Sequence, residues 1–154
     1  NESFASWMGD KAVDSLFPEW EMWTQFLTAD TNRALSLDGL KNSHPIEQEV
    51  NNPAEIGQLF DAISYSKGGS ILRMLEQYLG ADDFQNGLNI YLNRHAHANA
   101  RTRDLWNALG EASGQPVADI MDTWTGQTGY PFLDADIKRD SSGMEVALSQ
   151  SRFL

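Results

Sequence analysis

Apolar side chains recur every three or four residues along most of the chain, and this spacing predicts a series of amphipathic helices. The first is expected to end before Pro18, because the residue before a proline is pushed out of the helical region. Later helices are expected to end near Gly39, Gly80, Gly114 and Gly126, since glycine is a common helix terminator. The pattern indicates about six or seven helices with short connections, as in an α-helical bundle. Residues placed on the buried faces include Phe4, Trp7, Met8, Phe26, Ile71, Leu72, Leu75, Tyr78, Leu88, Leu109 and Met121.

The pattern changes from helical to alternating after Gly129. Residues 132–137 read as a strand, residues 141–143 as a turn, and Met144, Val146 and Leu148 alternate with less apolar neighbours. The fold class predicted is therefore mainly α: a helical bundle over residues 1–130 with a C-terminal β-hairpin over residues 131–154. A two-stranded hairpin is marginal in water by itself, so it must either lie on the helices or begin a larger β-domain.

One tyrosine stands at an unusual junction in the middle of the chain. Tyr65 lies between Ser64 and Ser66 and is followed closely by Gly68 and Gly69, and these residues disfavour a continuous helix. An apolar helix follows directly, so the tyrosine hydroxyl can face a cleft at the mouth of that helix. The alternative is a half-buried core tyrosine with a hydrogen-bonded tip, and spacing alone favours that alternative.

Composition excludes several classes of function. The net charge of −11 argues against nucleic acid and against an anionic membrane surface as partners. The absence of cysteine excludes disulfides and thiolate metal sites, and it is compatible with a cytoplasmic location. No apolar run reaches membrane-spanning length. Because the sequence opens on Asn1-Glu2 without a methionine and already in helical pattern, we interpret it as a piece of a longer protein.

The residues alone do not compose a complete active site. His95 and His97 are two positions apart and would point apart on a helix, while His44 precedes a proline in a polar loop. The segment Lys67-Gly68-Gly69-Ser70 lacks the upstream glycine and strand of a phosphate-binding loop. Glu2 in a first helical turn is, by itself, only a favourable charge at the positive end of the helix dipole.

Several segments, in the right order, resemble the M1 family of zinc aminopeptidases, the gluzincins related to aminopeptidase N and tricorn-interacting factors. Residues 1–7, Asn-Glu-Ser-Phe-Ala-Ser-Trp, are similar to the family's W-L-N-E-G-F-A segment, and residues 60–75 are similar to its tyrosine segment. Shorter matches lie at residues 43–46, 52–56, 104–106, 121–125 and 129–131. The resemblance covers about residues 1–135, and it implies that residues 1–130 are the helical C-terminal part of a thermolysin-like catalytic domain. Residues 131–154 would begin a truncated β-sandwich domain.

The resemblance implies two site residues. Glu2 matches the glutamate that serves as the third zinc ligand, and Tyr65 matches the tyrosine whose hydroxyl stabilises the oxyanion of the tetrahedral intermediate. Ser3 departs from the commoner glycine beside Glu2, which is a small change. The family's H-E-x-x-H and G-A-M-E-N segments do not occur in the 154 residues.

Zinc is therefore expected in the parent enzyme, whereas the chain alone is expected to be inactive and not to hold zinc stoichiometrically. The expected partners are peptide substrates in the parent enzyme and the N-terminal part of the catalytic domain. Without that part, the apolar faces of Phe4, Trp7 and Met8 and the hairpin edge are expected to be exposed and to cause self-association. The alternatives are a non-catalytic helical scaffold of the same fold and, within the family, an epoxide hydrolase-like member. Residue preference and oligomeric state do not follow from the sequence.

Overall fold

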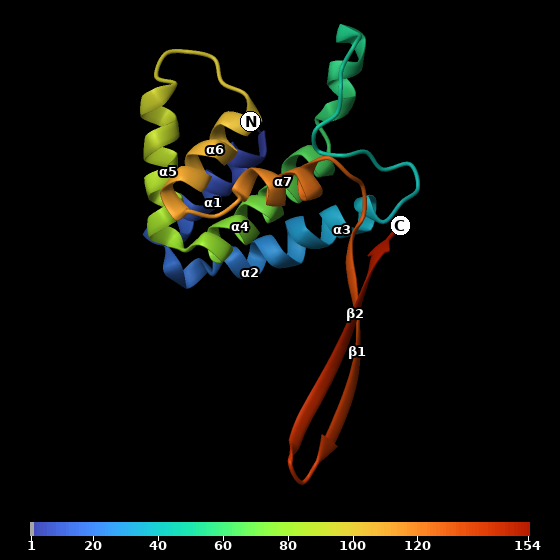
Figure 1. Ribbon diagram of the computed structural model, residues 1–154. Coiled ribbons are helices and arrows are strands. Elements are labelled where there is room, and N and C mark those ends of the chain that lie inside the picture. Colours follow the sequence, from blue (N-terminus) through green and yellow to red (C-terminus); the bar gives the residue numbers. More distant parts are fainter. Residues whose placement is uncertain (1) are drawn as a thin grey trace.

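The computed structural model describes residues 2–154, and the mainly α fold with a C-terminal hairpin is confirmed over that range. Seven α-helices lie within residues 2–154, with two 3₁₀ and two π-helical turns between them (Figure 1). The α-helices are α1 (Glu2–Leu16), α2 (Met22–Phe26), α3 (Asn32–Asp38), α4 (Gly68–Leu79), α5 (Ala81–Arg94), α6 (Thr102–Ser113) and α7 (Val117–Thr125). The 3₁₀ turns η1 and η3 span Pro18–Trp20 and Pro53–Leu59, and the π-helical turns η2 and η4 span Leu27–Thr31 and Ile63–Lys67. None of the helices in this range is long and apolar enough to cross a membrane.

One apolar core joins α1, α4, α5, α6 and α7. Trp7 of α1 is 0% exposed and packs against the ring of Phe84 of α5 at a centroid distance of 5.1 Å. Leu75, Leu109 and Met121 complete the buried centre from α4, α6 and α7. The core therefore holds α1 and α4 together, and these two elements carry or adjoin the predicted site residues.

The predicted break before α4 is wrong. The segment around Tyr65 is helical: η4 runs without interruption into α4, and the peptide group of Tyr65 donates to the carbonyl of Asp61 at 3.1 Å. A π-turn widens the helix by one residue, which accommodates the serines and glycines while changing the direction in which side chains project. The helices α2 and α3 are joined in the same way by η2.

Two expectations about apolar faces also need correction. Tyr78 is 60% exposed, because α4 turns only one narrow face toward the core. Trp7 was expected to present an apolar face for self-association, but it is fully buried against α4 and α5. Met8 remains exposed and Phe4 is half-buried, so only part of that expected face is on the surface.

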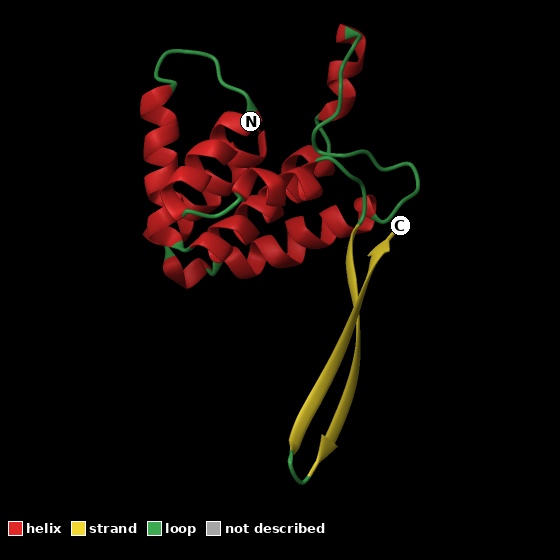
Figure 2. Ribbon diagram, in the orientation of Figure 1, coloured by secondary structure: helices red, strands yellow, loops and turns green. Residues whose placement is uncertain are grey.

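The hairpin extends away from the helices, as Figure 2 shows. Strands β1 (Tyr130–Asp140) and β2 (Gly143–Phe153) pair antiparallel, with Ile137 opposite Val146. Side chains along both strands are exposed, apart from the half-buried Tyr130 at the base. One face of the ribbon is apolar and the other polar, since alternate residues of each strand share a face. The apolar face carries Leu133, Ala135, Ile137, Met144, Val146 and Leu148.

Candidate functional site

The two predicted site residues, Glu2 and Tyr65, are 63 positions apart in the sequence but lie side by side in the structure. The hydroxyl of Tyr65, on η4, donates to the Oε2 of Glu2, in the first turn of α1, at 3.5 Å. Both side chains are half-buried, so they contact each other and remain accessible from one side. A 230 Å³ pocket adjoins Glu2 and is lined by Glu2, Ser3, Ile46, Ile56, Leu59, Phe60 and Ser64.

A glycine permits this approach. A Cβ placed on Gly68 would lie 2.6 Å from both the Cβ and the Oγ of Ser3, well inside normal contact distance. The backbone of the Tyr65 turn therefore rests directly on the first turn of α1. The neighbouring Gly69 is less constrained, since its nearest neighbour is the ring of Phe26 at 3.3 Å.

The environment keeps the Tyr65 hydroxyl protonated. Partial desolvation raises the pKa of Tyr65, and the nearby negative charge of Glu2 and the hydrogen bond to it raise it further. A phenol whose pKa is raised remains a hydrogen-bond donor over the neutral range. Such a donor can stabilise an oxyanion, whereas a phenolate cannot.

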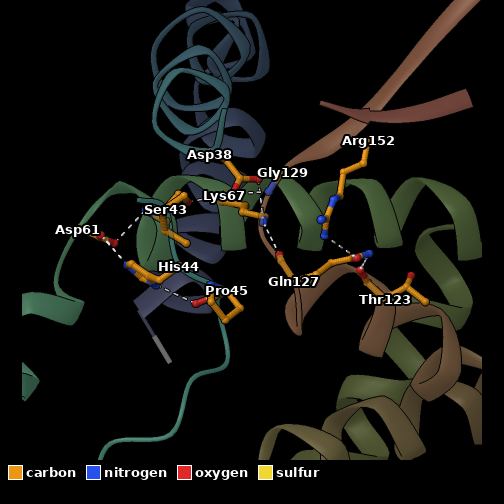
Figure 3. A network of polar contacts seen from close by, with 11 residues as sticks. Asp38, Ser43, His44, Pro45, Asp61, Lys67, Thr123, Gln127, Gly129 and Arg152 are labelled. Carbon is orange, nitrogen blue, oxygen red and sulfur yellow. Dashed lines mark hydrogen bonds and ion pairs between the residues drawn. The ribbon is translucent and has the colours of Figure 1, made fainter. Parts of the chain in front are cut away.

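The start of the Tyr65 turn is held by an aspartate and a histidine. The Oδ1 of Asp61 accepts from the backbone N–H groups of Ile63 and Ser64 at 2.9 and 3.1 Å. Its Oδ2 lies 2.7 Å from Nε2 of His44, whose Nδ1 lies 2.8 Å from the carbonyl oxygen of Pro45 (Figure 3). Because a carbonyl and a carboxylate only accept, the imidazole that satisfies both contacts is the cation.

The charges of this pair are coupled. Burial has the largest single effect on the pKa of His44 and lowers it, but the hydrogen bonds to Pro45 and Asp61 and the Asp61 charge outweigh burial and the repulsion from Lys67. The net result is a pKa above the usual 6.5. For Asp61, burial raises the pKa, yet hydrogen bonds from His44, Ser64 and Ile63 and the His44 charge leave it below 3.8.

The end of the turn is held by a second ion pair. Lys67 Nζ lies 2.8 Å from Oδ2 of Asp38, and both side chains are almost fully buried. Between the two ends, Ser66 donates to Oδ1 of Asp30 on η2 at 2.7 Å. Residues far apart in the sequence therefore hold both ends of the turn that presents Tyr65. Sequence periodicity missed His44, Asp61, Lys67 and Asp38, because no local pattern reports pairings between distant segments.

Near the site, the described residues offer a metal ion only one carboxylate at a time, that of Glu2. Within residues 2–154 no group of three histidine, cysteine or acidic side chains is placed to hold a metal ion. Glu2 forms no ion pair with any described residue, so its carboxylate can act as one oxygen ligand of a metal such as zinc. His95 and His97 follow the end of α5, and His44 pairs with Asp61.

Comparison with known proteins shows the family to which the chain is related. The sequence profile described as the peptidase family M1 domain matches residues 1–124. The chain is 55% identical over 154 residues to aminopeptidase M1 of Arabidopsis thaliana, covering all of this chain and 17% of that protein. It is 48% identical over 153 residues to tricorn protease-interacting factor F2 of Thermoplasma volcanium, covering 99% of this chain and 19% of that protein.

A third relative is the alanine/arginine aminopeptidase of Saccharomyces cerevisiae, which is 46% identical over 154 residues. That match covers all of this chain and 18% of the yeast protein. The chain thus spans less than a fifth of the length of these relatives. Since the family profile matches most of the sequence, the chain belongs to peptidase family M1.

Proposed function

We propose that this chain forms one wall of the active site of a zinc metalloaminopeptidase, which removes the N-terminal residue of peptides. The observation that carries the proposal is the contact between Tyr65 and Glu2 in a chain of peptidase family M1. A metal ligand and an oxyanion donor must both lie within a few ångströms of the scissile carbonyl, and the two side chains are already adjacent. The named relatives that are called aminopeptidases support the reaction class.

Each residue has one role in this proposal. The carboxylate of Glu2 is one ligand of the metal, and the remaining ligands come from outside the chain. When bound, zinc supplies Lewis-acid polarisation of the scissile carbonyl. The hydroxyl of Tyr65 donates a hydrogen bond to the carbonyl oxygen as negative charge develops there, and removing one such donor costs about 10²–10³ in kcat. The turn at residues 61–68 and the start of α1 hold the two groups in place.

The domain assignment belongs to the same proposal. Residues 1–130 are the helical part of the catalytic domain, and residues 131–154 are the first two strands of a β-sandwich. The exposed apolar face of the hairpin supports this assignment, because a ribbon with one apolar face needs a covering layer. The N-terminal part of the catalytic domain is then the partner that supplies the missing metal ligands and the residues that hold the substrate's amino group.

A graft tests the proposal. The corresponding segment of Arabidopsis aminopeptidase M1 is replaced by this chain, and the purified protein is assayed with aminoacyl fluorogenic substrates and for bound zinc. We expect peptidase activity and one zinc per active site, both lost on Glu2→Ala. An inactive graft that is folded and holds zinc would favour the non-catalytic scaffold, and hydrolysis of an epoxide without peptidase activity would favour the epoxide hydrolase-like alternative.

The isolated chain offers a second test. One carboxylate cannot hold a catalytic zinc ion, which takes three protein ligands. We therefore expect the isolated chain to show no turnover and no stoichiometric zinc in equilibrium dialysis at micromolar metal. Specific turnover, abolished by a chelator and restored by zinc, would contradict this expectation.

A further inference from the structure

The ion pair between Lys67 and Asp38 lies where the catalytic turn meets the hairpin. Their side chains are 7% and 3% exposed, and Nζ of Lys67 is 2.8 Å from Oδ2 of Asp38. The same ammonium donates to the carbonyl oxygen of Gln127 at 2.9 Å. Figure 3 shows the two side chains meeting from η4 and α3 beside the connection between α7 and β1.

Asp38 joins three segments through one carboxylate. Besides the Lys67 ammonium, it accepts from the backbone N–H of Gly129 at 2.9 Å and from the hydroxyl of Ser43 at 3.1 Å. Gly129 has a φ of +79° and immediately precedes β1. The pair therefore ties the turn that carries Tyr65 to the residue at which the chain leaves the helices.

The second strand is linked to the same point. Nη1 of Arg152, on β2, lies 3.4 Å from Oε1 of Gln127, whose carbonyl oxygen accepts from Lys67. A Cβ on Gly129 would lie 2.4 Å from the carbonyl oxygen of Phe153, so the two ends of the hairpin also close tightly on each other. The start of β1 is therefore one hydrogen bond from the Lys67–Asp38 pair, through Gly129, and the end of β2 is linked to the pair through Gln127 and Gly129.

Stability alone is a weak explanation for such a pair. Removing two charges from water is costly, and well-packed apolar residues often stabilise a fold as much as a buried ion pair or more. What the pair adds is a fixed geometry, because each of its hydrogen-bonding contacts has a set direction and distance. An apolar cavity of about 290 Å³ adjoins it, with Ile71, Met74 and Trp124 in its lining, so packing on that side does not by itself fix the turn.

We propose that Lys67 and Asp38 are positioning residues whose buried ion pair fixes the Tyr65 turn against α1 and sets the hairpin on the same anchor. Lys67 lies two residues from Tyr65 and one from Gly68, which rests on Ser3. A shift of the anchor therefore moves the Tyr65 hydroxyl relative to Glu2. The catalytic consequence rests on the proposed function, whereas the structural consequence does not.

The structural consequence is measured on the chain itself by NMR. We expect Lys67→Met to weaken the cross-peaks between the Tyr65 ring and the Glu2 side chain and between Gly68 and Ser3. We also expect amide exchange over residues 63–69 to accelerate by about tenfold or more, as a local opening of the turn becomes easier. Asp38→Asn, which keeps the side-chain shape and removes the charge, should have the same effect if Lys67→Met does not fold.

The matched control is Lys11→Met. Lys11 pairs with the buried Glu76, which keeps its second partner, Arg73, at 3.0 Å. This variant also removes a lysine that pairs with a buried carboxylate, but Lys11 itself is 42% exposed and the pair joins α1 to the C-terminal half of α4. We expect it to leave the Tyr65 and Gly68 cross-peaks unchanged. Unchanged cross-peaks and exchange in both Lys67→Met and Asp38→Asn, or equal changes in Lys11→Met, would overturn the proposal.

The catalytic consequence is measured in the graft described above. Because Tyr65 acts on charge that develops in the transition state, displacing it should lower kcat by about 10- to 100-fold with KM within about twofold. Lys11→Met should leave both constants unchanged. If Tyr65→Phe is as active as the unsubstituted graft, the proposed function fails, and the NMR cross-peaks still decide whether the anchor positions the turn. An unchanged kcat in Lys67→Met, beside a large loss in Tyr65→Phe, would refute the catalytic part.

Discussion

The contact between Gly68 and Ser3 gives the sharpest test of how α1 meets the Tyr65 turn. In Gly68→Ala the new Cβ would lie 2.6 Å from the Cβ and Oγ of Ser3, against about 3.5–4.0 Å for a normal carbon contact. Neither Ser3 atom is the end of a long flexible chain, so the two backbones must separate. Overpacking of this kind costs about 1–3 kcal/mol. The helix propensity of alanine over glycine offsets about 1 kcal/mol of that cost.

A double-mutant cycle isolates the steric part. Ser3→Gly removes both clashing atoms, so Gly68→Ala in that background should stabilise the protein by up to about 1 kcal/mol instead of destabilising it. The difference between the two backgrounds is the coupling free energy, which we expect to be about 1–3 kcal/mol. Urea unfolding followed by tryptophan fluorescence and circular dichroism measures it for the four proteins of the cycle.

Gly9 supplies the control. It also lies in α1, and nothing is within 4 Å of a Cβ placed on it, so Gly9→Ala should be stabilising and should not couple to Ser3→Gly. A coupling free energy below about 0.5 kcal/mol between Ser3 and Gly68 would refute the reasoning, because it is within the range found for independent sites. The Tyr65 turn would then not rest on α1, and the contact between Tyr65 and Glu2 would lose its support.

Three further predictions follow from single features of the fold. Because the pKa of His44 is raised in the folded state, its pairing with Asp61 contributes stability that is present below pH 6.5 and is lost as the pH rises through the folded-state pKa. Because the pKa of Asp61 is lowered, the same contribution is also lost as the pH falls below 3.8. Urea unfolding should therefore show that His44→Gln is more destabilising at pH 5.5 than at pH 8.5, and an equal loss at both would contradict the pairing. Gly87→Ala should destabilise the protein by about 1–3 kcal/mol, since the new Cβ would lie 2.8 Å from the Cα of Leu109, and unfolding at or above the wild-type urea midpoint would show that α5 and α6 are not in contact there. The exposed apolar face of the hairpin should cause association at high protein concentration, and Ile137→Lys on that face should shift the light-scattering mass toward the monomer; a wild-type mass that stays monomeric at every concentration would refute this.

The elements of the fold could be predicted from sequence because their signals are local. A period of three to four residues and a period of two are visible in the chain, and Gly39, Gly80 and Gly114 follow or end the helices as expected. The π-turns could not be predicted in this way, because the shift that one extra residue causes in the apolar pattern looks the same in a sequence as a break between two helices. The serines and glycines around Tyr65 therefore predict a break from their low helix propensity, whereas the structure continues the helix through η4.

The site could be predicted only in part. Glu2 and Tyr65 came from a family resemblance, since a separation of 63 residues carries no distance information. The sequence assigns Lys67 no role beyond a segment that does not fit a phosphate-binding loop, yet its side chain is buried beside Asp38, 29 residues earlier, which neutralises it. The burial of such a residue depends on its partner, and the partner is visible only in three dimensions.

The proposed function gives the Tyr65 hydroxyl its role on the developing oxyanion, beside a metal held in part by Glu2. Its most direct test is Tyr65→Phe in the graft, which removes one oxygen atom and leaves the ring in place. We expect kcat to fall by about 10²–10³ with KM and zinc content unchanged, because the hydroxyl acts only in the transition state. A Tyr65→Phe graft with the kcat of the unsubstituted graft would contradict it.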